Sequence, residues 1–445
     1  MNLGQDSFLS ELPDAWTFDR FKDVAVLCNE RTDEASEVED YLELEDLESG
    51  TGRILTRRNT MEVVSDVTRF KKGDVLFGKL RPYLEKFYVA EFDGKCTGEI
   101  LAFKPVRIES RFLFYCLASS WFIERCNMLA YGAKMPRVNW PTQLAQFNLP
   151  LPPLPEQQRI AAYLDASCAA IDAAVAAKRR QIETLDALRN SIISRAVTHG
   201  LNPQAKMKSS GLDWLSEVPA HWQVQQIKRA CSLVRGQFTH RPRNDPALYD
   251  GPYPFVQTGD ITAARKYIRT YSQTLNELGL SVSKRFPRGT LVMSIAANIG
   301  DVAILDFEAC FPDSMIGVIP GYKTNLDFLY YLMRAMRSIM LRSAVQSTQL
   351  NLNYVRIGTN FAPLPPLKEQ SEIAEYLDAK EGESHLISNT IESQIATLTA
   401  YRKSLIHECV TGQRRITEAD SASSPQADVT AAQRVDPSLS KLRQI

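Results

Sequence analysis

Two stretches of the chain carry a long helical pattern of apolar positions without any proline. In the first, the apolar residues are spaced by 7, 4, 7, 3 and 7 positions, and they are Leu164, Ile171, Val175, Ile182, Leu185 and Ile192. In the second, they are Leu377, Ile387, Ile391, Ile395, Leu398 and Leu405, with the seam interrupted near Gly382 to Ser384. Such spacing is typical of a coiled coil, so each stretch is predicted to be a helix of about 40 residues that needs a partner helix.

The two helical stretches belong to an internal repeat. Residues 150–199 recur as residues 363–412 at a constant offset of 213 without a gap, and 23 of these 50 positions are identical. Each copy opens with a strap of sequence Leu-Pro-Pro-Leu-x-Glu-Gln, which cannot be helical until its end because proline keeps the preceding residue out of the α region. A period this long indicates two domains. The two seams favour an intrachain antiparallel pair; the alternative is that each helix packs separately on a partner protein.

The segments that precede the two copies are much less alike, although they share traces of the repeat. Asp74–Gly78 and Thr290–Ser294 are predicted to be buried strands, each entered by a glycine turn. Residues 111–129 and 326–345 are aromatic and apolar at helical spacing, and each is predicted to be one helix. The predicted class is α+β, with two globular α/β domains separated by two long helices in a pseudo-two-fold repeat.

The predicted domain boundaries follow this alternation. The divisions are 1–150 and 201–363 for the two globular bodies, 151–200 and 364–416 for the helical segments, and 417–445 for a tail whose composition predicts disorder.

Composition indicates an ordinary cytoplasmic protein of 445 residues, of which 44% are hydrophobic. No apolar run approaches the ~20 residues that a membrane span needs, and the first residues lack the basic start of a signal peptide. The eight cysteines never form a Cys-x-x-Cys pair, and the five histidines show no zinc-binding pattern. We therefore expect buried free thiols in a reducing compartment and no metal site.

The net charge of zero conceals two basic bodies. Residues 201–363 hold 18 Lys/Arg against 11 Asp/Glu, and residues 49–150 hold 16 against 9, so each segment carries a charge of +7. The first 48 residues are acidic because nine carboxylates lie between Asp33 and Glu48. Two basic bodies are typical of phosphate-contacting modules, although a solvated surface gives the same balance.

Each body ends in a polar loop whose side chains suit nucleic acid, Tyr131–Trp140 in the first and Gln346–Tyr354 in the second. Lys and Arg pair with guanine edges or phosphates, and Gln and Asn bond adenine edges, although a simple return turn would look similar. No phosphate-binding glycine loop, Asn/Asp-Pro-Pro-aromatic methyltransferase motif or nuclease core is found in the sequence. The sequence therefore predicts a non-catalytic chain.

These features resemble the DNA-specificity subunit of type I restriction-modification systems. The resemblance covers nearly the whole chain and rests on the paired straps, each followed by Ile-Ala-x-Tyr-Leu-Asp, on the entry segment Lys208–Trp222, and on Gly73–Pro82. It implies two target recognition domains that each read half of a split DNA site. The helices would form a spacer that sets the unread gap and docks two methyltransferase subunits, around Ala170 and Leu398.

The resemblance also implies which residues and partners act. DNA contacts are expected from one set of polar side chains, which is Lys79, Arg81, Lys134, Arg137, Asn298, Thr348, Gln349, Asn351 and Asn353. S-adenosylmethionine, ATP and Mg would be bound by methyltransferase and restriction/translocase subunits, and none by this chain. The acidic stretch is expected to face solvent, a partner subunit or a lysine-rich patch. The rival interpretations are a protein-binding adaptor with a coiled-coil strut and a self-sufficient methyltransferase or nuclease.

Overall fold

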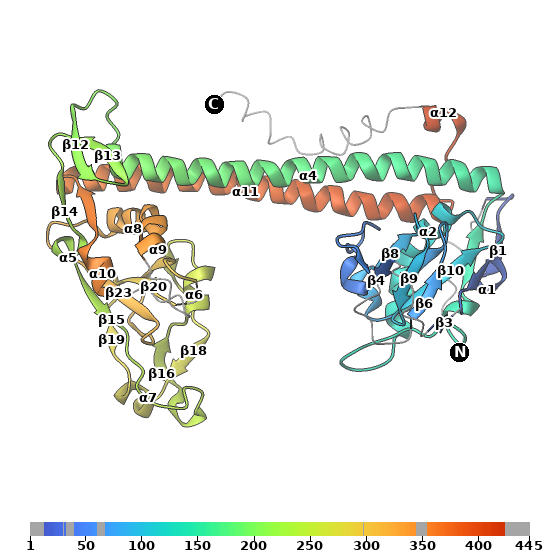
Figure 1. The fold of residues 1–445 in the computed structure, drawn as a ribbon, viewed down its shortest axis with the longest axis horizontal. Coiled ribbons are helices and arrows are strands. Elements are labelled where there is room, and N and C mark those ends of the chain that lie inside the picture. Colours follow the sequence, from blue (N-terminus) through green and yellow to red (C-terminus); the bar gives the residue numbers. More distant parts are fainter. Residues whose placement is uncertain are drawn as a thin grey trace. The chain divides into compact units, whose positions relative to one another are not determined.

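The computed structural model describes residues 13–29, 31–32, 40–59, 67–296, 298–343 and 354–422. It separates into two compact units (Figure 1). Unit 1 comprises residues 1–180 and 390–445, and unit 2 comprises residues 181–389. Each unit therefore contains one globular body together with half of each long helix.

The body of unit 1 is built from short strands and helices. Its elements are β1 (Thr17–Arg20), α1 (Phe21–Val24), β2 (Ala25–Leu27), β3 (Arg31–Thr32), β4 (Asp40–Leu42), β5 (Arg58–Asn59), β6 (Val67–Phe70), β7 (Val75–Gly78), β8 (Phe87–Val89), β9 (Gly94–Thr97), β10 (Ile100–Pro105), α2 (Ser110–Ala118), α3 (Ser120–Leu129) and β11 (Asn148–Leu151). Short 3-10 helices within the described ranges join them, at Leu44–Asp46, Pro82–Leu84 and Leu144–Gln146.

The described strands of unit 1 form a two-stranded sheet of β1 and β11 and two larger sheets. The larger sheets have the strand orders β2-β10-β7-β8 and β3-β6-β9-β4-β5, so spatial neighbours are often not consecutive in the sequence. The main core lies between the first sheet and helices α2 and α3, where Phe77 and Phe122 meet edge to face at 5.4 Å. The predicted strand Asp74–Gly78 is confirmed as β7, because its four residues Val75–Gly78 are all buried.

Unit 2 repeats this plan with more strands. Its elements are β12 (Met207–Leu212), β13 (Leu215–Pro219), β14 (Gln223–Gln226), α5 (Ile227–Ala230), β15 (Cys231–Arg235), β16 (Tyr249–Phe255), α6 (Thr258–Ala263), β17 (Tyr267–Ile268), β18 (Gln273–Leu275), α7 (Glu277–Ser281), β19 (Arg285–Phe286), β20 (Leu291–Ser294), β21 (Val302–Leu305), β22 (Ala309–Cys310), β23 (Met315–Pro320), α8 (Leu326–Ala335), α9 (Arg337–Ser343), α10 (Tyr354–Thr359) and β24 (Phe361–Leu364). The sheets have the orders β15-β23-β20-β21-β17 and β18-β16-β22-β19. The predicted strand Thr290–Ser294 is confirmed as β20.

The prediction of one continuous helix near the end of each body was wrong. In unit 1 the helix breaks at Ser119, which has an extended backbone and whose Oγ accepts a hydrogen bond from the Phe122 amide at 3.4 Å. Ser119 thus ends α2 and caps α3. In unit 2, α8 ends before Met336 and α9 begins at Arg337.

The two long helices are α4 (Leu154–His199) and α11 (Leu367–Val410), and they pair within each unit. In unit 1, Arg402 Nε lies 3.3 Å from Asp172 Oδ1 and Lys178 Nζ donates to Gln394 Oε1 at 2.5 Å. As residue numbers rise along α4 they fall along α11, which confirms the antiparallel pair. The predicted seams are buried where they also meet the bodies, with Leu164, Ile171 and Leu398 at most 2% exposed, and half-buried midway along the helices, as at Ile182 and Ile391.

Each body is fastened to its strap by the same contacts. β1 pairs with β11 in unit 1, and β14 pairs with β24 in unit 2. Gln157, only 1% exposed, donates to Pro152 O at 2.8 Å and accepts from the Glu109 amide at 2.8 Å, just before α2. Gln370 makes the equivalent bonds to Pro365 O at 2.9 Å and to the Asn325 amide at 2.8 Å, just before α8. The strap glutamine therefore fixes where a core helix of each body begins.

The far end of each long helix is closed by a glycine and a tryptophan. Gly200 follows α4 with φ +75°, and Trp222 donates from Nε1 to Glu369 Oε2 at 3.0 Å. In unit 1, Gly412 follows α11 with φ +78°, and a Cβ placed on it would lie only 2.7 Å from Pro13 Cδ. Only a residue without a side chain fits there. The start of the described chain therefore touches the end of its last long helix.

The first part of the tail that was predicted to be disordered is helical. Glu418–Ala422 form the short helix α12, and the rest of the predicted disordered segment lies outside the described residues. One helix among the described residues, α4, has the length and composition of a membrane span, which is weak evidence because core helices pass the same test. The expected absence of a span stays a prediction.

Candidate nucleic-acid interface

The first body brings together basic residues that are about fifty positions apart in the sequence. After β7 the chain turns sharply, with Arg81 in the left-handed region at φ 50°. The Val138 amide donates to Lys79 O at 3.1 Å, and the Arg81 amide donates to Pro136 O at 2.7 Å. These bonds lay the segment after β7 along the 134–138 segment, so Lys79, Arg81, Lys134 and Arg137 form one cluster, which we call the first basic loop pair.

The four side chains of the first basic loop pair differ in their hydrogen bonds and ion pairs. Arg137 forms a bidentate ion pair with Glu99, in which Nε donates to Oε2 and Nη2 donates to Oε1, each at 3.0 Å. This bonding raises the pKa of Arg137. Arg81 donates to Lys134 O at 3.1 Å, which holds the two segments together. Lys79 and Lys134 have no side-chain hydrogen bond or ion pair to the described residues, and Lys134 is exposed. The two lysines are thus available to a phosphate, whereas the two arginines shape the loops.

The second body places Asn298 in the equivalent loop, between β20 and β21. Its Nδ2 donates to Thr262 Oγ1 at 2.9 Å, and that hydroxyl donates to Asp301 Oδ2 at 3.0 Å. Asp301 in turn pairs with Arg337 at 2.8 Å. The other predicted DNA contacts of this body lie outside the described residues, namely Thr348, Gln349, Asn351 and Asn353.

The acidic stretch of the first body is neutralised by an arginine of its own body. Arg58 lies 3.2 Å from Glu43, 2.6 Å from Glu45 and 2.8 Å from Asp46, and Asp46 is only 1% exposed. The expectation that the stretch faces solvent, a partner or a lysine-rich patch holds for Glu45, which is 70% exposed, and was wrong for Asp46, which is buried against Arg58. Residues 33–39 lie outside the described residues.

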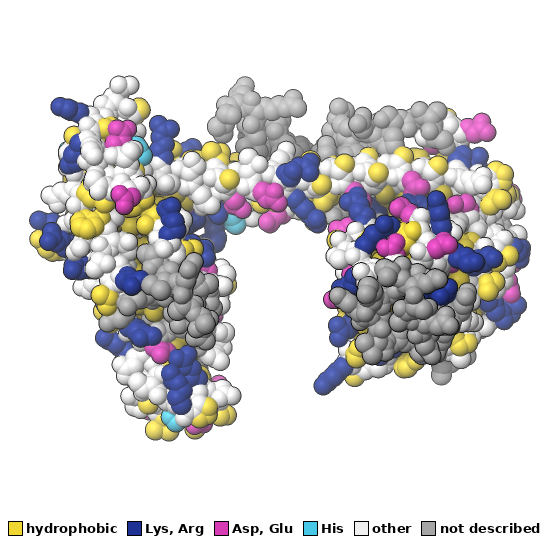
Figure 2. Space-filling view, viewed as in Figure 1, with side chains coloured by type: hydrophobic (Ala, Val, Ile, Leu, Met, Phe, Trp, Pro, Cys, Tyr) yellow, Lys and Arg dark blue, Asp and Glu magenta, His cyan; other side chains and the backbone are white. Residues whose placement is uncertain are grey.

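Sequence reasoning missed the basic residues at the junction between the second body and the long helices. Arg265 and Arg337 of the body and Arg189 of α4 line one cavity with Asn298. The run Ala264-Arg265-Lys266 was the available signal, but nothing in the sequence places it beside α4. Figure 2 shows lysine and arginine side chains on both bodies, interleaved with acidic ones where the first body meets the helices.

The cysteines and acids do not form a reactive site in the part of the chain that is described. All eight cysteines are free thiols, and burial raises the pKa of Cys96 to about 12, so this thiol stays protonated and unreactive. No group of three His, Cys, Asp or Glu side chains in the described ranges is arranged to hold a metal ion.

Two α+β bodies that are fastened alike to an antiparallel helix pair, with polar loops at equivalent strand ends, define a duplicated protein with two recognition modules. The family model described as the type I restriction modification DNA specificity domain matches twice, over residues 13–184 and 219–397. The chain belongs to this family, which covers both bodies and most of both helices. This membership does not favour the adaptor interpretation.

Curated relatives and solved structures are consistent with the family. The chain is 26% identical over 337 residues to the MjaX type I restriction enzyme specificity subunit of Methanocaldococcus jannaschii, covering 71% of this chain and 73% of that one. It is 26% identical over 209 residues to the Escherichia coli EcoDI specificity subunit, so this match spans about half of each chain, 46%.

The solved structures support the fold. A chain from work on complex assembly and conformational transition of the type I R-M system gives a TM-score of 0.72 at 20% identity, covering 91% of this chain and 99% of that chain. The HsdS subunit from Thermoanaerobacter tengcongensis gives 0.50 at 19% identity, covering 91% and 98%.

Proposed function

We propose that this chain is the non-catalytic DNA-specificity subunit of a type I restriction-modification complex. Each body reads one half of a bipartite site, and the helix pair sets the unread gap between the halves. The observation that carries this proposal is the repeat of one fastening around two different bodies. The strap glutamine bonds recur in both units at the same positions, whereas the sheets that they hold differ in strand number and order.

The first basic loop pair contacts DNA through its free lysines. Lys79 and Lys134 bind backbone phosphates, and Arg81 holds the two segments in register. Glu99 occupies the Nε and Nη2 side of the Arg137 guanidinium, so Arg137 reads a base edge with Nη1 and the second hydrogen of Nη2. In the second body, Asn298 and the residues Thr348, Gln349, Asn351 and Asn353 read the other half-site.

The chemistry comes from partner subunits in this proposal. Two methyltransferase subunits dock on the helices around Ala170 and Leu398 and use S-adenosylmethionine to methylate adenine. A restriction/translocase subunit with ATP and Mg can join the complex, which works in the cytoplasm. This chain binds none of these cofactors and determines which DNA sequence the complex recognises.

Base-resolution mapping of adenine methylation tests the proposal directly. The host genome is compared with and without this gene, in a strain that keeps the neighbouring methyltransferase gene. We expect one bipartite methylated motif to disappear and to return on complementation. An unchanged methylome, with the methyltransferase shown to be active, would refute the specificity role.

The free lysines of the first basic loop pair predict a salt effect. Replacing both, Lys79→Gln and Lys134→Gln, lowers the slope of log affinity against log salt by about 2, since each phosphate contact contributes about 1. Lys72→Gln is the matched control, because exposed Lys72 lies at the other end of the same strand β7. A slope that falls equally in the control would show a diffuse charge effect.

A further inference from the structure

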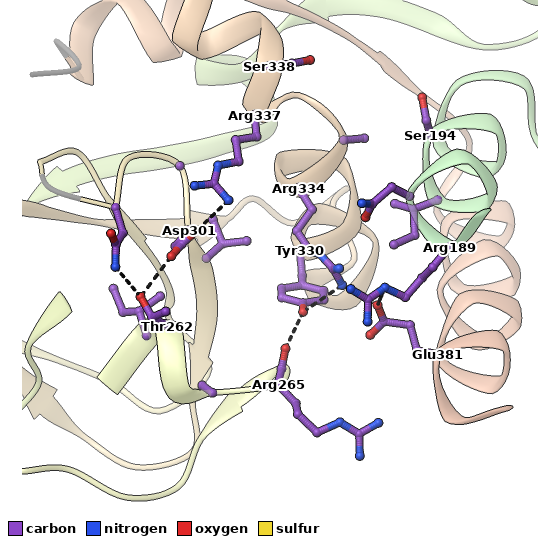
Figure 3. Close-up of a pocket in the computed structure, with 18 of the residues that line it drawn as sticks. Arg189, Ser194, Thr262, Arg265, Asp301, Tyr330, Arg334, Arg337, Ser338 and Glu381 are labelled. Atoms are coloured by element: carbon purple, nitrogen blue, oxygen red, sulfur yellow. Dashed lines mark hydrogen bonds and ion pairs between the residues drawn. The ribbon is translucent and has the colours of Figure 1, made fainter. Parts of the chain in front are cut away.

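Unit 2 contains a cavity of about 940 Å³ between its body and the two long helices. Its wall combines Arg189 of α4 and Glu381 of α11 with α6, α8, α9 and the loop between β20 and β21 (Figure 3). Its volume is within the range of small-ligand sites. The nucleic-acid loops described above use only one of its residues, Asn298.

The cavity wall is electropositive. Four arginines line it, Arg189, Arg265, Arg334 and Arg337, against the two carboxylates Asp301 and Glu381. Arg337 Nη1 pairs with Asp301 at 2.8 Å, and Arg334 Nη1 pairs with Glu381 at 2.5 Å. Glu381 also forms a longer ion pair with Arg189, whose Nε lies 4.0 Å from Glu381 Oε1. This Nε is buried and has no hydrogen-bond partner among the described residues.

One arginine of the wall has no carboxylate of its own. The Arg265 side chain has no ion pair to the described residues, and Figure 3 shows its guanidinium apart from both carboxylates. Its backbone is fixed, because Tyr330 OH donates to Arg265 O at 2.7 Å. With Asp186 beside Arg189, the four arginines face three carboxylates, so the wall presents about one uncompensated positive charge, at Arg265.

Unit 1 shows how the same space is closed in the other repeat. Arg402 is the repeat equivalent of Arg189, and it pairs with Asp172 at 3.3 Å and donates to Gly50 O at 2.8 Å. Arg53 of the same loop pairs with the other Asp172 oxygen at 2.8 Å. In unit 1 a loop of the body thus ties both helices down, and a carboxylate neutralises the arginine.

Neither feature is present among the described residues of unit 2. The repeat equivalent of Asp172 is His385, which lines the cavity and carries no carboxylate. Arg189 instead pairs weakly, with Asp186 of its own helix at 3.2 Å. Unit 2 thus has no carboxylate at the position of Asp172, and a positive cavity of ligand size lies at this place.

We propose that this cavity binds a phosphate group that ties the second body to the helix pair, as the Gly50–Arg53 loop does in the first. Arginine forks bind phosphate oxygens through paired charge-assisted hydrogen bonds. The uncompensated charge of Arg265 matches one phosphodiester, and the Arg189 Nε, which has no hydrogen-bond partner among the described residues, is a further donor for its oxygens. The phosphate belongs either to the DNA backbone beside the second half-site or to a free nucleotide. The DNA source rests on the proposed function, whereas the free source does not.

The first arm of the test uses the full chain with inorganic phosphate and with ATP, measured by titration calorimetry. Arg265→Gln removes the uncompensated exposed charge, and His385→Asp restores the carboxylate of unit 1. Both variants are expected to weaken phosphate binding on the order of tenfold, the cost of one charge-assisted contact. Arg288→Gln is the control, because Arg288 is 74% exposed and pairs with Asp306 outside the cavity.

The second arm measures DNA affinity of the chain with its methyltransferase partners over a range of salt. If the phosphate is that of DNA, Arg265→Gln lowers the salt slope by about 1 and Arg288→Gln leaves it unchanged. Phosphate or ATP binding that both variants weaken identifies the free source, even for a chain that binds no DNA. The proposal is overturned if neither arm separates the variants from the control, or if a hexaglutamate peptide binds more tightly than phosphate.

Discussion

Both units attach a body to the pair of long helices, but they share only one of their two sets of contacts. Both hold a body on antiparallel helices through the same strap glutamine and the same capped helix, α2 or α8. Both also bond the aspartate of the Tyr-Leu-Asp motif to a tyrosine of that helix, Tyr115 to Asp165 and Tyr331 to Asp378, each at 2.6 Å. The second fastening differs, since unit 1 closes it with its own loop and unit 2 leaves a cavity.

This difference separates what the repeat must keep from what it can change. The strap contacts are buried, and loss of one partner would leave a polar group unsatisfied at a cost of about 1–3 kcal/mol. The contacts at Asp172 and His385 lie farther along the helices, and they differ between the units although Arg402 and Asp172 are only 11% and 16% exposed. The repeat has therefore kept its fastening at the strap and diverged at this second contact, where unit 2 has a cavity.

The largest expected effect comes from exchanging a whole body. Replacing residues 1–150 with those of a relative should change one methylated half-site completely and leave the other half and the gap unchanged. The reason is that each body is held by its own strap contacts within one unit. Methylation mapping of the hybrid provides the measurement, and a change in both halves would contradict independent units.

A smaller change should follow from shortening the helix pair. We expect deletion of one heptad from each helix, residues 178–184 and the facing 388–394, to preserve the seam and remove about 10 Å of helix. The unread gap should shrink by about 3 base pairs, at ~3.4 Å per pair. Deleting the heptad from α4 alone is the control, since it breaks the pairing. A methylated motif with an unchanged gap would refute the role of the helices as a ruler.

Equivalent arginines should differ in their contribution to stability. Arg402→Ala removes two contacts of an arginine that is only 11% exposed, and is expected to lower the free energy of unfolding of unit 1 by about 2 kcal/mol. Arg189→Ala should cost unit 2 less than about 1 kcal/mol, because that ion pair is longer and 35% exposed. Amide hydrogen exchange reports each unit separately, and equal losses would show that the unit 1 loop adds nothing.

The smallest expected effect is a pH dependence of the stability of unit 1. Burial lowers the pKa of His407 below its ordinary value of 6.5, against the opposing charges of Glu124 and Glu408. The folded state thus favours the neutral ring, so this contribution to stability is complete above pH 6.5 and is lost as pH falls towards the folded pKa. Unit 2 has Ser194 at the equivalent position. Acid should therefore loosen α11 in unit 1, and His407→Gln should abolish this part of the pH dependence in hydrogen exchange.

The helices could be predicted from the sequence because their signals are local and repeated. The proline strap, the period of 213 residues and the seam all act within one segment, and the structure confirms the pair. The bodies could not be predicted in detail, since strands such as β3 and β5 have only two residues and pair out of sequence order. The break at Ser119 was missed because a serine in an apolar run has the same pattern whether it lies inside a helix or caps one.

The candidate site was predictable as residue types but not as a geometry. Lys79 and Lys134 were both expected, yet only the backbone bonds from Arg81 to Pro136 and from Val138 to Lys79 show that they share one surface. The DNA contact expected of Arg137 stays a prediction, and the sequence did not show that Glu99 bonds its Nε and Nη2. The cavity of unit 2 has no local signature, because its arginines come from four separate elements.

The contact between Pro13 and Gly412 gives the chain the topology of a ring with one cut. Strap, long helix, closing glycine and tryptophan follow one another in both halves, and after Gly412 the next part in this order is the segment that begins at Pro13. Moving the cut would keep both strap fastenings but would remove the contacts of residues 414–416 with α4, such as the bond from Arg414 to the Tyr163 hydroxyl at 2.7 Å. Joining residue 412 to residue 13 by a short linker and opening new ends between Gly200 and Lys206 would give the same two readers in the opposite order along the gene.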